Sequence, residues 1–421
     1  MPVTDHSDDS PADAMLLDAA RFAFADAFVP RIGIAVSGGG DSMALLHLYA
    51  HLAQRLGFQI FAVTVDHGLR PEAADEAVFV AEFCAARGIS HHVLRWTDWD
   101  KTGNLMAAAR DARYRLIAKW AAEQGIAHVV LGHTTDDVAE NFLIRLARKS
   151  GPDGLAVMDA RFHRHGIAWA RPLSQQSRAN LRGYLQRHGV AWVDDPTNDD
   201  PSYDRTRARR TLETLAPLGI STDVLTTVST TMGRARDALN HYAQIEARRY
   251  VVQGQGDLVL RLGLTGPLPD ETKRRLWLAA VKWINGADHP PRQAAFFEVI
   301  HGLTSDGTVT VGGCLITRNG DNWRVTRELK AVQEKTCTTS DIWDGRWRLD
   351  GPHTPGLQVR ALGEGIRDCP EWRDTGLPRA SLMATPAVWH GDALIAAPMA
   401  RLTAGWTAQI VSDFHSSAFA H

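Results

Sequence analysis

The chain has 421 residues, a formal net charge of −2, and 44% hydrophobic and 22% charged residues. These proportions are those of an ordinary globular protein and exclude disordered and collagen-like classes, and no apolar run approaches the roughly 20 residues that cross a bilayer. The length exceeds what one hydrophobic core usually organises, so we expect two or three domains.

The first residues, MPVTDHSDDSPADAM, are polar and acidic. They lack the basic segment and the apolar segment of an export signal, so we expect a cytoplasmic protein that makes no membrane contact.

Short apolar runs then alternate with helical patterns. We expect strands over Arg31–Val36, Gln59–Asp66, Ser90–Trp96, Ala127–Gly132 and, less regularly, Ile167–Leu173. We expect helices over Asp41–Leu56, Glu72–Arg87, Asn104–Gln124 and Thr134–Lys149. This alternation predicts an α/β fold with right-handed βαβ units and a parallel sheet covered on both faces. In such sheets, ligands bind at the carboxyl ends of the strands.

The pattern changes after Pro217. We expect a helix over Asp223–Val251, a strand over Gly254–Leu262, helices over Glu271–Ile284 and Arg292–Leu303, and a hairpin over Thr308–Thr326 that turns at Asn319-Gly320. From about Leu329, short β-like pieces rich in Gly, Pro and Trp follow. The predicted domains are therefore a catalytic domain over residues 1–217, an α-rich domain over 218–328 and a small β-rich domain over 329–421.

The stretch SGGGDS lies between the first expected strand and the first expected helix. It is not a Walker loop, because no Gly-Lys pair follows, and it is not a dinucleotide fingerprint, because the third glycine position falls on Met43. What remains is a glycine turn at a helix N-terminus, where backbone N–H groups and the helix dipole bind anions. The expected phosphate-binding residues are Ser37, Gly38, Gly39, Gly40, Asp41 and Ser42.

Asp41 is the only carboxylate of this loop. A carboxylate repels phosphate unless a cation lies between them, so Asp41 indicates Mg²⁺ with a bound polyphosphate. The alternative is a glycine turn that Asp41 or Ser42 caps, without any ligand.

SGGGDS after a strand resembles the PP-loop of the N-type ATP pyrophosphatases, which cleave ATP between its α and β phosphates. Within that superfamily, five further blocks resemble the tRNA(Ile)-lysidine synthase family, in the same order. These blocks are Val65–Ala77, Gly103–Tyr114, Leu131–Leu155, Arg171–Arg209 and Val309–Glu328. The resemblance spans about Arg31 to Glu328.

The resemblance implies a two-step reaction on the CAU anticodon of tRNA(Ile). ATP adenylates C2 of the wobble cytidine and releases pyrophosphate, and free L-lysine then displaces AMP to give lysidine. ATP, Mg²⁺, this tRNA and lysine are the expected cofactors and partners, and a homodimer is one expected assembly.

Adenylation needs a metal and cationic groups around the α-phosphate. Asp41, Asp136 and Asp137 offer carboxylates, with Asp41 and Asp137 as the expected metal ligands. Arg110 and Arg113 share one helix face and are expected at the α-phosphate or the adenylated base. The alternatives are a solvated helix face for the arginines and an N-cap for the two neighbouring aspartates. Either Asp136 or Asp137 could bind the lysine amine.

Three residues at strand ends complete the expected nucleotide pocket. Val65 and His67 follow the second strand and are expected at the adenine or ribose, and His133 follows the fourth strand. The alternative for Val65 and His67 is ordinary turn chemistry, and for His133 a satisfied structural histidine.

Arginines gather between residues 161 and 210, where RNA contact needs cations for phosphates and rings for unstacked bases. The candidate cations are Arg171, Arg178, Arg182, Arg187, Arg205, Arg207, Arg209 and Arg210, among which Arg178, Arg182, Arg205, Arg207 and Arg209 form the predicted RNA-binding set. The candidate rings are Tyr184, Trp192 and Tyr203. The alternative is a salt-bridged surface helix with buried aromatic residues.

The chain departs from the family pattern at three positions. Val138 and Asn141 replace a glutamine and a threonine, and Lys149 stands where glycine is usual. Two other functions stay open. One is a related tRNA thiolase, against which the absence of paired cysteines counts, and the other is a non-catalytic RNA- or nucleotide-binding protein.

Overall fold

A computed structural model describes residues 10–21, 23, 29–68, 72–99, 102–194, 202–262, 268–286 and 293–419. The chain divides into two compact units, residues 1–236 and residues 237–420. The boundary between them lies within helix α9 (Thr222–Tyr250). The three-domain division at residues 217 and 328 stays a prediction.

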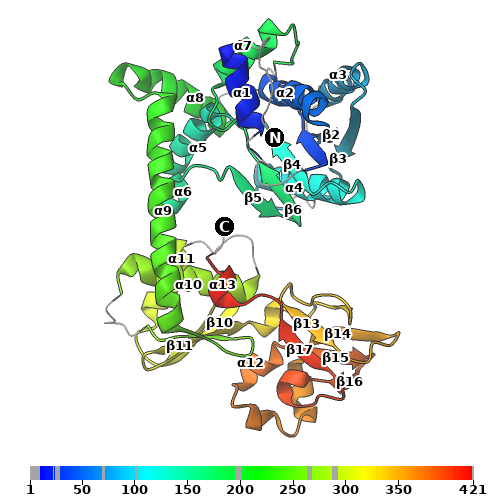
Figure 1. Cartoon of the computed structure of the whole chain (residues 1–421). Coiled ribbons are helices and arrows are strands. Elements are labelled where there is room, and N and C mark those ends of the chain that lie inside the picture. The colour runs from blue at the N-terminus through cyan, green and yellow to red at the C-terminus, as the bar shows by residue number, and fades with distance from the viewer. Residues whose placement is uncertain are drawn as a thin grey trace. The chain divides into compact units, whose positions relative to one another are not determined.

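The first unit is built on a six-stranded sheet in the order β3-β2-β1-β4-β6-β5 (Figure 1). The strands are β1 (Arg31–Ala35), β2 (Gln59–Asp66), β3 (Ser90–Arg95), β4 (His128–Leu131), β5 (Arg161–Arg164) and β6 (Ile167–Ala170). Five of them pair in parallel, as predicted, but β5 pairs antiparallel with β6 at the edge. The short polar sequence of β5 carries no strand signal, so this hairpin was not predicted.

Among the described residues of this unit, eight α-helices precede α9. They are α1 (Pro11–Arg21), α2 (Gly40–Leu56), α3 (Ala73–Ala85), α4 (Leu105–Glu123), α5 (Thr135–Ala147), α6 (Pro152–Leu155), α7 (Arg178–Arg187) and α8 (Asp204–Leu215). The four helices α2 to α5 follow the predicted ranges closely, whereas α1, α6, α7 and α8 were not predicted.

Alternate residues of the central strands enter two different cores. Ile34 and Val130 belong to the core that α1, α2 and α7 cover, whereas Val129 and Leu131 belong to the core that α4 covers. Because both faces of the sheet are buried, the strands are apolar throughout. The absence of a side chain at Gly33 leaves room for Trp120 to pack on the second face, since a Cβ there would lie 3.1 Å from the Trp120 ring.

The chain order places a ligand site between β1 and β4. After β1 the chain adds β2 and β3 on one side and then returns to add β4 on the other side. Such a reversal of strand order opens a crevice at the carboxyl ends of the two strands. The residues after β1 and those after β4 therefore face one another.

Helix α1 is anchored to α2 and α7 by polar contacts. Tyr49 of α2 donates to the carbonyl of Ala20 at 2.9 Å. Asp13, buried in α1, accepts from Arg187 Nη2 at 2.5 Å and lies 3.1 Å from His188 Nε2. Burial raises the pKa of Asp13, but Arg187 and His188 outweigh burial and hold the pKa below its usual value.

Asp13→Asn is expected to lower the free energy of unfolding by about 2 kcal/mol at neutral pH, because a charged hydrogen-bond partner of Arg187 is lost. A depressed carboxyl pKa stabilises the fold above the unfolded-state pKa, and this contribution is lost as the pH falls through the folded-state pKa. The difference between variant and parent should therefore shrink from about pH 5 toward about pH 2 in urea titrations. Asp18→Asn, at an exposed position of the same helix, is the control; an equal loss there would contradict the prediction.

The second unit contains helices and three sheets. Its further helices are α10 (Asp270–Asn285), α11 (Gln293–Gly302), α12 (Arg379–Met383) and α13 (Phe414–Ser417). The first sheet, in the order β7-β8-β11-β10-β9, contains β7 (Val251–Gln253), β8 (Leu258–Leu260), β9 (Gly307–Val311), β10 (Cys314–Asn319) and β11 (Asn322–Arg327). The predicted hairpin turn at Gly320 joins β10 to β11, and Gly320 has the left-handed φ of 58° that this turn needs. Arg292, the predicted start of the second helix, lies outside the described residues.

The C-terminal part is β-rich, as predicted. It contains β12 (Cys337–Thr338), β13 (Trp347–Asp350), β14 (Leu357–Ala361), β15 (Pro386–His390), β16 (Ala393–Ala396) and β17 (Thr407–Ile410). These strands form the sheet β12-β14-β15-β16 and the pair β13-β17, around a core of their own. Among the described residues, no helix is both long and apolar enough to span a membrane.

Candidate active site

The SGGGDS loop joins β1 to α2 and is shaped by its own hydroxyl groups. Ser37 N donates to Ser42 Oγ at 3.1 Å, and Ser42 Oγ donates to the carbonyl of Gly39 at 2.9 Å. Gly38 has a φ of +85°, which a residue with a Cβ rarely adopts. Its carbonyl accepts from Val193 N at 3.0 Å, so the segment after α7 braces the loop. The loop leads into the N-terminus of α2, the kind of helix end at which anions bind, and this is where the sequence predicts the anion site.

The end of β4 lies directly against this loop. A Cβ on Gly132 would lie 3.0 Å from the Asp41 carbonyl oxygen and 3.2 Å from the Ser42 Cα. Both contacts are with backbone atoms, so the residues after β4 and the start of α2 can approach this closely only because residue 132 is glycine.

Gly132→Ala is therefore expected to force the loop and β4 apart. The cost should be about 1–3 kcal/mol of stability, with weaker ATP binding, as measured by thermal unfolding and calorimetry. Gly151→Ala is the control, because a Cβ there meets nothing within 4 Å and its φ is −78°. Equal ATP binding by both variants would show that the close approach of Gly132 to the start of α2 is not needed for ATP binding.

Helix α5 begins at the same crevice with a capping box. Thr134 caps the helix, and its N–H and hydroxyl donate to Asp137 Oδ2 at 2.9 and 3.1 Å. Asp136 Oδ2 accepts from the backbone N–H of Arg178 at 2.7 Å. The N-cap is Thr134 and neither aspartate; Asp136 and Asp137 are first-turn acids, and Asp137 completes the capping box with only one of its two oxygens.

Arg178, the first residue of α7, brings the carboxylates of the crevice together. Its Nε lies 3.2 Å from Asp41 Oδ2, its Nη1 lies 3.3 Å from Glu140 Oε1, and its Nη2 lies 3.9 Å from Asp137 Oδ1. The side chain of Arg178 is 23% exposed and that of Glu140 only 1%. The predicted RNA contact of Arg178 therefore competes with an internal role that the sequence did not indicate.

Two arginines of α8 approach the same acids. Arg209 Nε donates to Glu140 Oε1 at 2.6 Å, and Arg205 Nη1 lies 3.7 Å from Asp137 Oδ1. Glu140 was not among the predicted site residues, although it follows Asp136 by four positions on one helix face. That spacing is the signal that would have indicated it.

Burial and charge shift the pKa values of these acids in opposite directions. Burial, with help from Asp137 and Asp136, raises the pKa of Asp41, and Arg178 only partly offsets this. Burial also raises the pKa of Asp137, but Arg205, His133, Thr134 and Arg178 outweigh it, so that the pKa is lowered. A negatively charged Asp41 is therefore short of cationic partners, which favours a site for a further cation.

A second group of arginines surrounds Tyr114 on the α4 side. Arg110 Nη2 donates to the Tyr114 hydroxyl at 3.3 Å, and Arg171 Nη2 donates to it at 3.4 Å. Arg113 contacts the same ring, and its pKa is lowered by burial and by the cations around it. Arg171 is buried and also donates to the Asp159 carbonyl, so we leave it out of the RNA surface.

His133 lies between the two groups. Burial, together with Arg171, Arg113 and Arg110, lowers the pKa of His133 to about 3, although Asp137 opposes this. It is therefore neutral at physiological pH, and the arginines of α4 lie close enough to β4 to act on it.

The end of β2 lies at the same edge of the sheet. Ala35, the last residue of β1, pairs with Val63, so Val65 lies level with the start of the SGGGDS loop. His67 packs edge-on against Trp96 with the ring centroids 5.8 Å apart, and burial and Arg113 lower its pKa. This position agrees with the predicted adenine or ribose contact but does not test it.

The remaining RNA candidates divide into exposed and buried residues. Arg182 and Arg207 are roughly half exposed and pair with Asp194 and Asp204, respectively. Tyr203 is 41% exposed. Tyr184 was wrongly considered for base stacking, because it is completely buried and its hydroxyl contacts His47 Nδ1 at 2.7 Å. Arg187 is engaged by Asp13, and Trp192 packs against Gly40.

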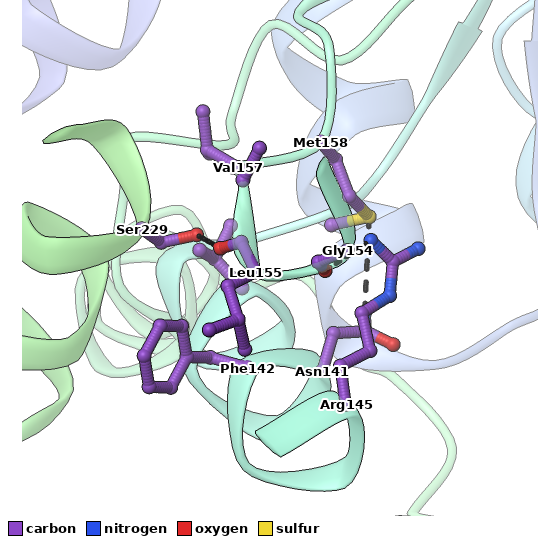
Figure 2. Close-up of a pocket in the computed structure, with 10 residues that line it drawn as sticks. Asn141, Phe142, Arg145, Gly154, Leu155, Val157, Met158 and Ser229 are labelled. Carbon is purple, nitrogen blue, oxygen red and sulfur yellow. Dashed lines mark hydrogen bonds between the residues drawn. The ribbon is translucent and has the colours of Figure 1, made fainter. Parts of the chain in front are cut away.

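Figure 2 shows the pocket beside α5 where the chain departs from the family pattern. Asn141 Nδ2 donates to the Asp137 carbonyl at 2.9 Å and lies 3.8 Å from Met158 Sδ, and Arg145 donates to the Gly154 carbonyl at 2.7 Å. These bonds hold the loop after α5 without the usual threonine. Lys149 in that loop has a φ of +56°, the left-handed conformation that explains why glycine is usual there.

The residues present fit Mg²⁺ bound together with ATP. Asp41 Oδ1 is buried and accepts no hydrogen bond within the described part of the chain, and Asp137 Oδ1 is not used by the capping box. No group of three His, Cys, Asp or Glu residues poised to hold a metal occurs among the described residues. Mg²⁺ usually takes one or two carboxylates and completes its shell with phosphate oxygens and water, so a pair of acids beside a phosphate loop suits it.

Comparison with known proteins agrees with this arrangement. A family model described as a PP-loop domain matches residues 18–215. A tRNA(Ile)-lysidine synthase of Ruegeria pomeroyi is 44% identical over 395 residues, which cover 93% of this chain and 94% of that protein. Those of Wolbachia pipientis wMel and a Bradyrhizobium species are 34% and 38% identical and cover 75% and 76% of this chain, and 76% and 95% of their own lengths.

The match to the Ruegeria pomeroyi protein extends over more than nine tenths of both chains. The predicted α/β fold with its PP-loop is confirmed. The chain belongs to the tRNA(Ile)-lysidine synthase family.

Proposed function

We propose that the protein uses ATP to modify the wobble cytidine of the CAU anticodon of tRNA(Ile) with lysine, giving lysidine, AMP and pyrophosphate. The observation that carries the proposal is the convergence of Asp41 and Asp137 on one guanidinium beside the SGGGDS loop. Carboxylates at a phosphate-binding helix N-terminus suit a metal–polyphosphate complex.

The first step forms a bond between O2 of the cytidine and the α-phosphorus, and the bond to the β-phosphate oxygen breaks. Pyrophosphate leaves into the anion site at the start of α2, where helix amides and the hydroxyl of Ser37 can stabilise it. In the second step the lysine amine attacks C2 and gives up a proton, and the bond from C2 to the AMP oxygen breaks.

Mg²⁺, held by Asp41 and Asp137, would neutralise charge on the transferring phosphates when bound. Arg110 and Arg113 lie on the other side of His133 and can take the α-phosphate oxygens through charge-assisted hydrogen bonds. His133 stays neutral and so adds no repulsion toward these arginines. Asp136 and Asp137 are the candidate acceptors for the lysine ammonium group.

The proposed RNA surface consists of Arg182, Arg205, Arg207 and Arg209, with Tyr203 as a candidate for base stacking. Arg178 contributes if RNA or ATP draws it away from the acids. A cytoplasmic location and a homodimer remain part of the proposal.

The test is to incubate the protein with ATP, labelled lysine and tRNA transcripts. Label should enter tRNA(Ile) with a CAU anticodon, and one pyrophosphate should form for each lysine added. Binding of the transcript without label would favour the non-catalytic alternative. A thiolase is disfavoured, because burial raises the pKa of all four cysteine thiols, Cys84, Cys314, Cys337 and Cys369, and keeps them protonated.

A further inference from the structure

Arg178 occupies the space where a metal ion bound by the acids would lie. Its guanidinium is within 4 Å of Asp41, Asp137 and Glu140 at once. Mg²⁺ binds carboxylate oxygens at about 2.0–2.1 Å and excludes other cations from the same lone pairs. A metal ion that bridges Asp41 and Asp137 would therefore compete with the guanidinium, which faces Asp41 Oδ2 and Asp137 Oδ1, for the same two carboxylates.

We infer that Arg178 is an internal counterion that occupies the acidic site in place of the metal and leaves it when the metal–nucleotide complex enters. The inference rests on the proposed function, in that it takes Asp41 and Asp137 as metal ligands. It adds a competition between a side chain and the metal, which makes Arg178 a positioning residue of the reaction.

The structure offers a position to which the guanidinium can move. Glu140 already accepts from Arg178 Nη1 through Oε1, while its other oxygen, Oε2, is buried without a hydrogen bond. A small rotation toward Glu140 would form a bidentate pair and free the oxygens of Asp41 and Asp137. Because the α7 N-terminus lies beside the phosphate loop, the displaced guanidinium can also meet the phosphates.

The main chain at Arg178 does not depend on its side chain. The N–H of Arg178 donates to Asp136, and Thr135 N donates to the Gln176 carbonyl at 3.0 Å, so the start of α7 stays joined to α5. Glu140 keeps its ion pair with Arg209. Arg178→Met should therefore retain the fold, at some cost in stability from the lost pair with Glu140, while it removes the competing charge.

The experiment measures Mn²⁺ binding to the full chain without nucleotide or RNA, from the electron paramagnetic resonance signal of free Mn²⁺. Arg178→Met is expected to bind Mn²⁺ at least about tenfold more tightly than the parent, because a positive charge that competes for two carboxylates is gone. Arg178→Lys should fall between the two. Adding Asp41→Asn to Arg178→Met should abolish the gain.

Arg182→Met is the matched control, because Arg182 lies one turn along the same helix and pairs with Asp194; its Mn²⁺ affinity should equal that of the parent. Unchanged or weaker Mn²⁺ binding in folded Arg178→Met, checked by circular dichroism, overturns the inference. Since the measurement needs neither ATP nor tRNA, a failure of lysine transfer would contradict the proposed function and leave this result standing.

Discussion

Asp41→Asn is expected to abolish adenylation of the tRNA while leaving most of its affinity for tRNA. The substitution keeps the shape of the side chain but removes the only carboxylate of the loop, so the proposed metal loses one of its two protein ligands. A loss of about a thousandfold in turnover corresponds to about 4 kcal/mol of transition-state stabilisation, an ordinary magnitude for one electrostatic group in an active site. Release of pyrophosphate in single-turnover assays measures the first step directly.

Arg207→Ala is the matched contrast. Arg207 lies on α8 with its side chain 55% exposed, and it pairs with Asp204 of the same helix. We expect weaker binding to tRNAs of every sequence, and a slope of log affinity against log salt concentration that is smaller by about one unit. Pyrophosphate release at saturating tRNA should be near normal. If both variants lose both activities equally, the division between a chemical site and an RNA surface is wrong.

Glu140→Gln is expected to loosen α8 from α5. Glu140 is almost completely buried and balances Arg178 and Arg209, so the neutral amide leaves two partly buried cations without their shared anion. Removing one partner of a buried ion pair typically costs about 3–5 kcal/mol. Hydrogen exchange should show lost protection at the amides of α5 and α8, with the β-rich part of the second unit unchanged.

Glu213→Gln serves as the control for that measurement, because Glu213 is an exposed residue of α8. Its exchange pattern should match that of the parent, since an exposed charge contributes little to stability. Equal protection of α8 in Glu140→Gln and the parent would mean that the buried acid is dispensable for holding the helix.

The sequence predicted the parts of this site that rest on local patterns. Strands β1 and β4 are continuous apolar runs, and helical spacing follows each of them, so the convergence of Asp41 and Asp137 followed from the rule that parallel strands end at one edge. The loop was recognisable from its glycines because only a tight turn before a helix needs them.

Long-range placements were not predictable in the same way. Helix α7 has the polar sequence RANLRGYLQR, in which nothing local tells whether Arg178 faces solvent or a carboxylate that lies 137 positions earlier. Arginine clusters suggest RNA contact in general, but nothing local in the sequence shows that two members of this cluster, Arg178 and Arg209, also neutralise the buried Glu140. Tyr184 failed as a stacking candidate for the same reason, since its burial depends on α2, a helix distant in sequence.

The bond between Arg178 and Asp41 also bears on how the protein is made. The phosphate loop emerges from the ribosome early, but its arginine partner follows only after well over a hundred further residues. Until then the strands that end at the crevice can pair while their acids repel one another. Completion of α7 should therefore be a late event in folding, and a chain halted before it would hold a formed sheet with an unneutralised crevice.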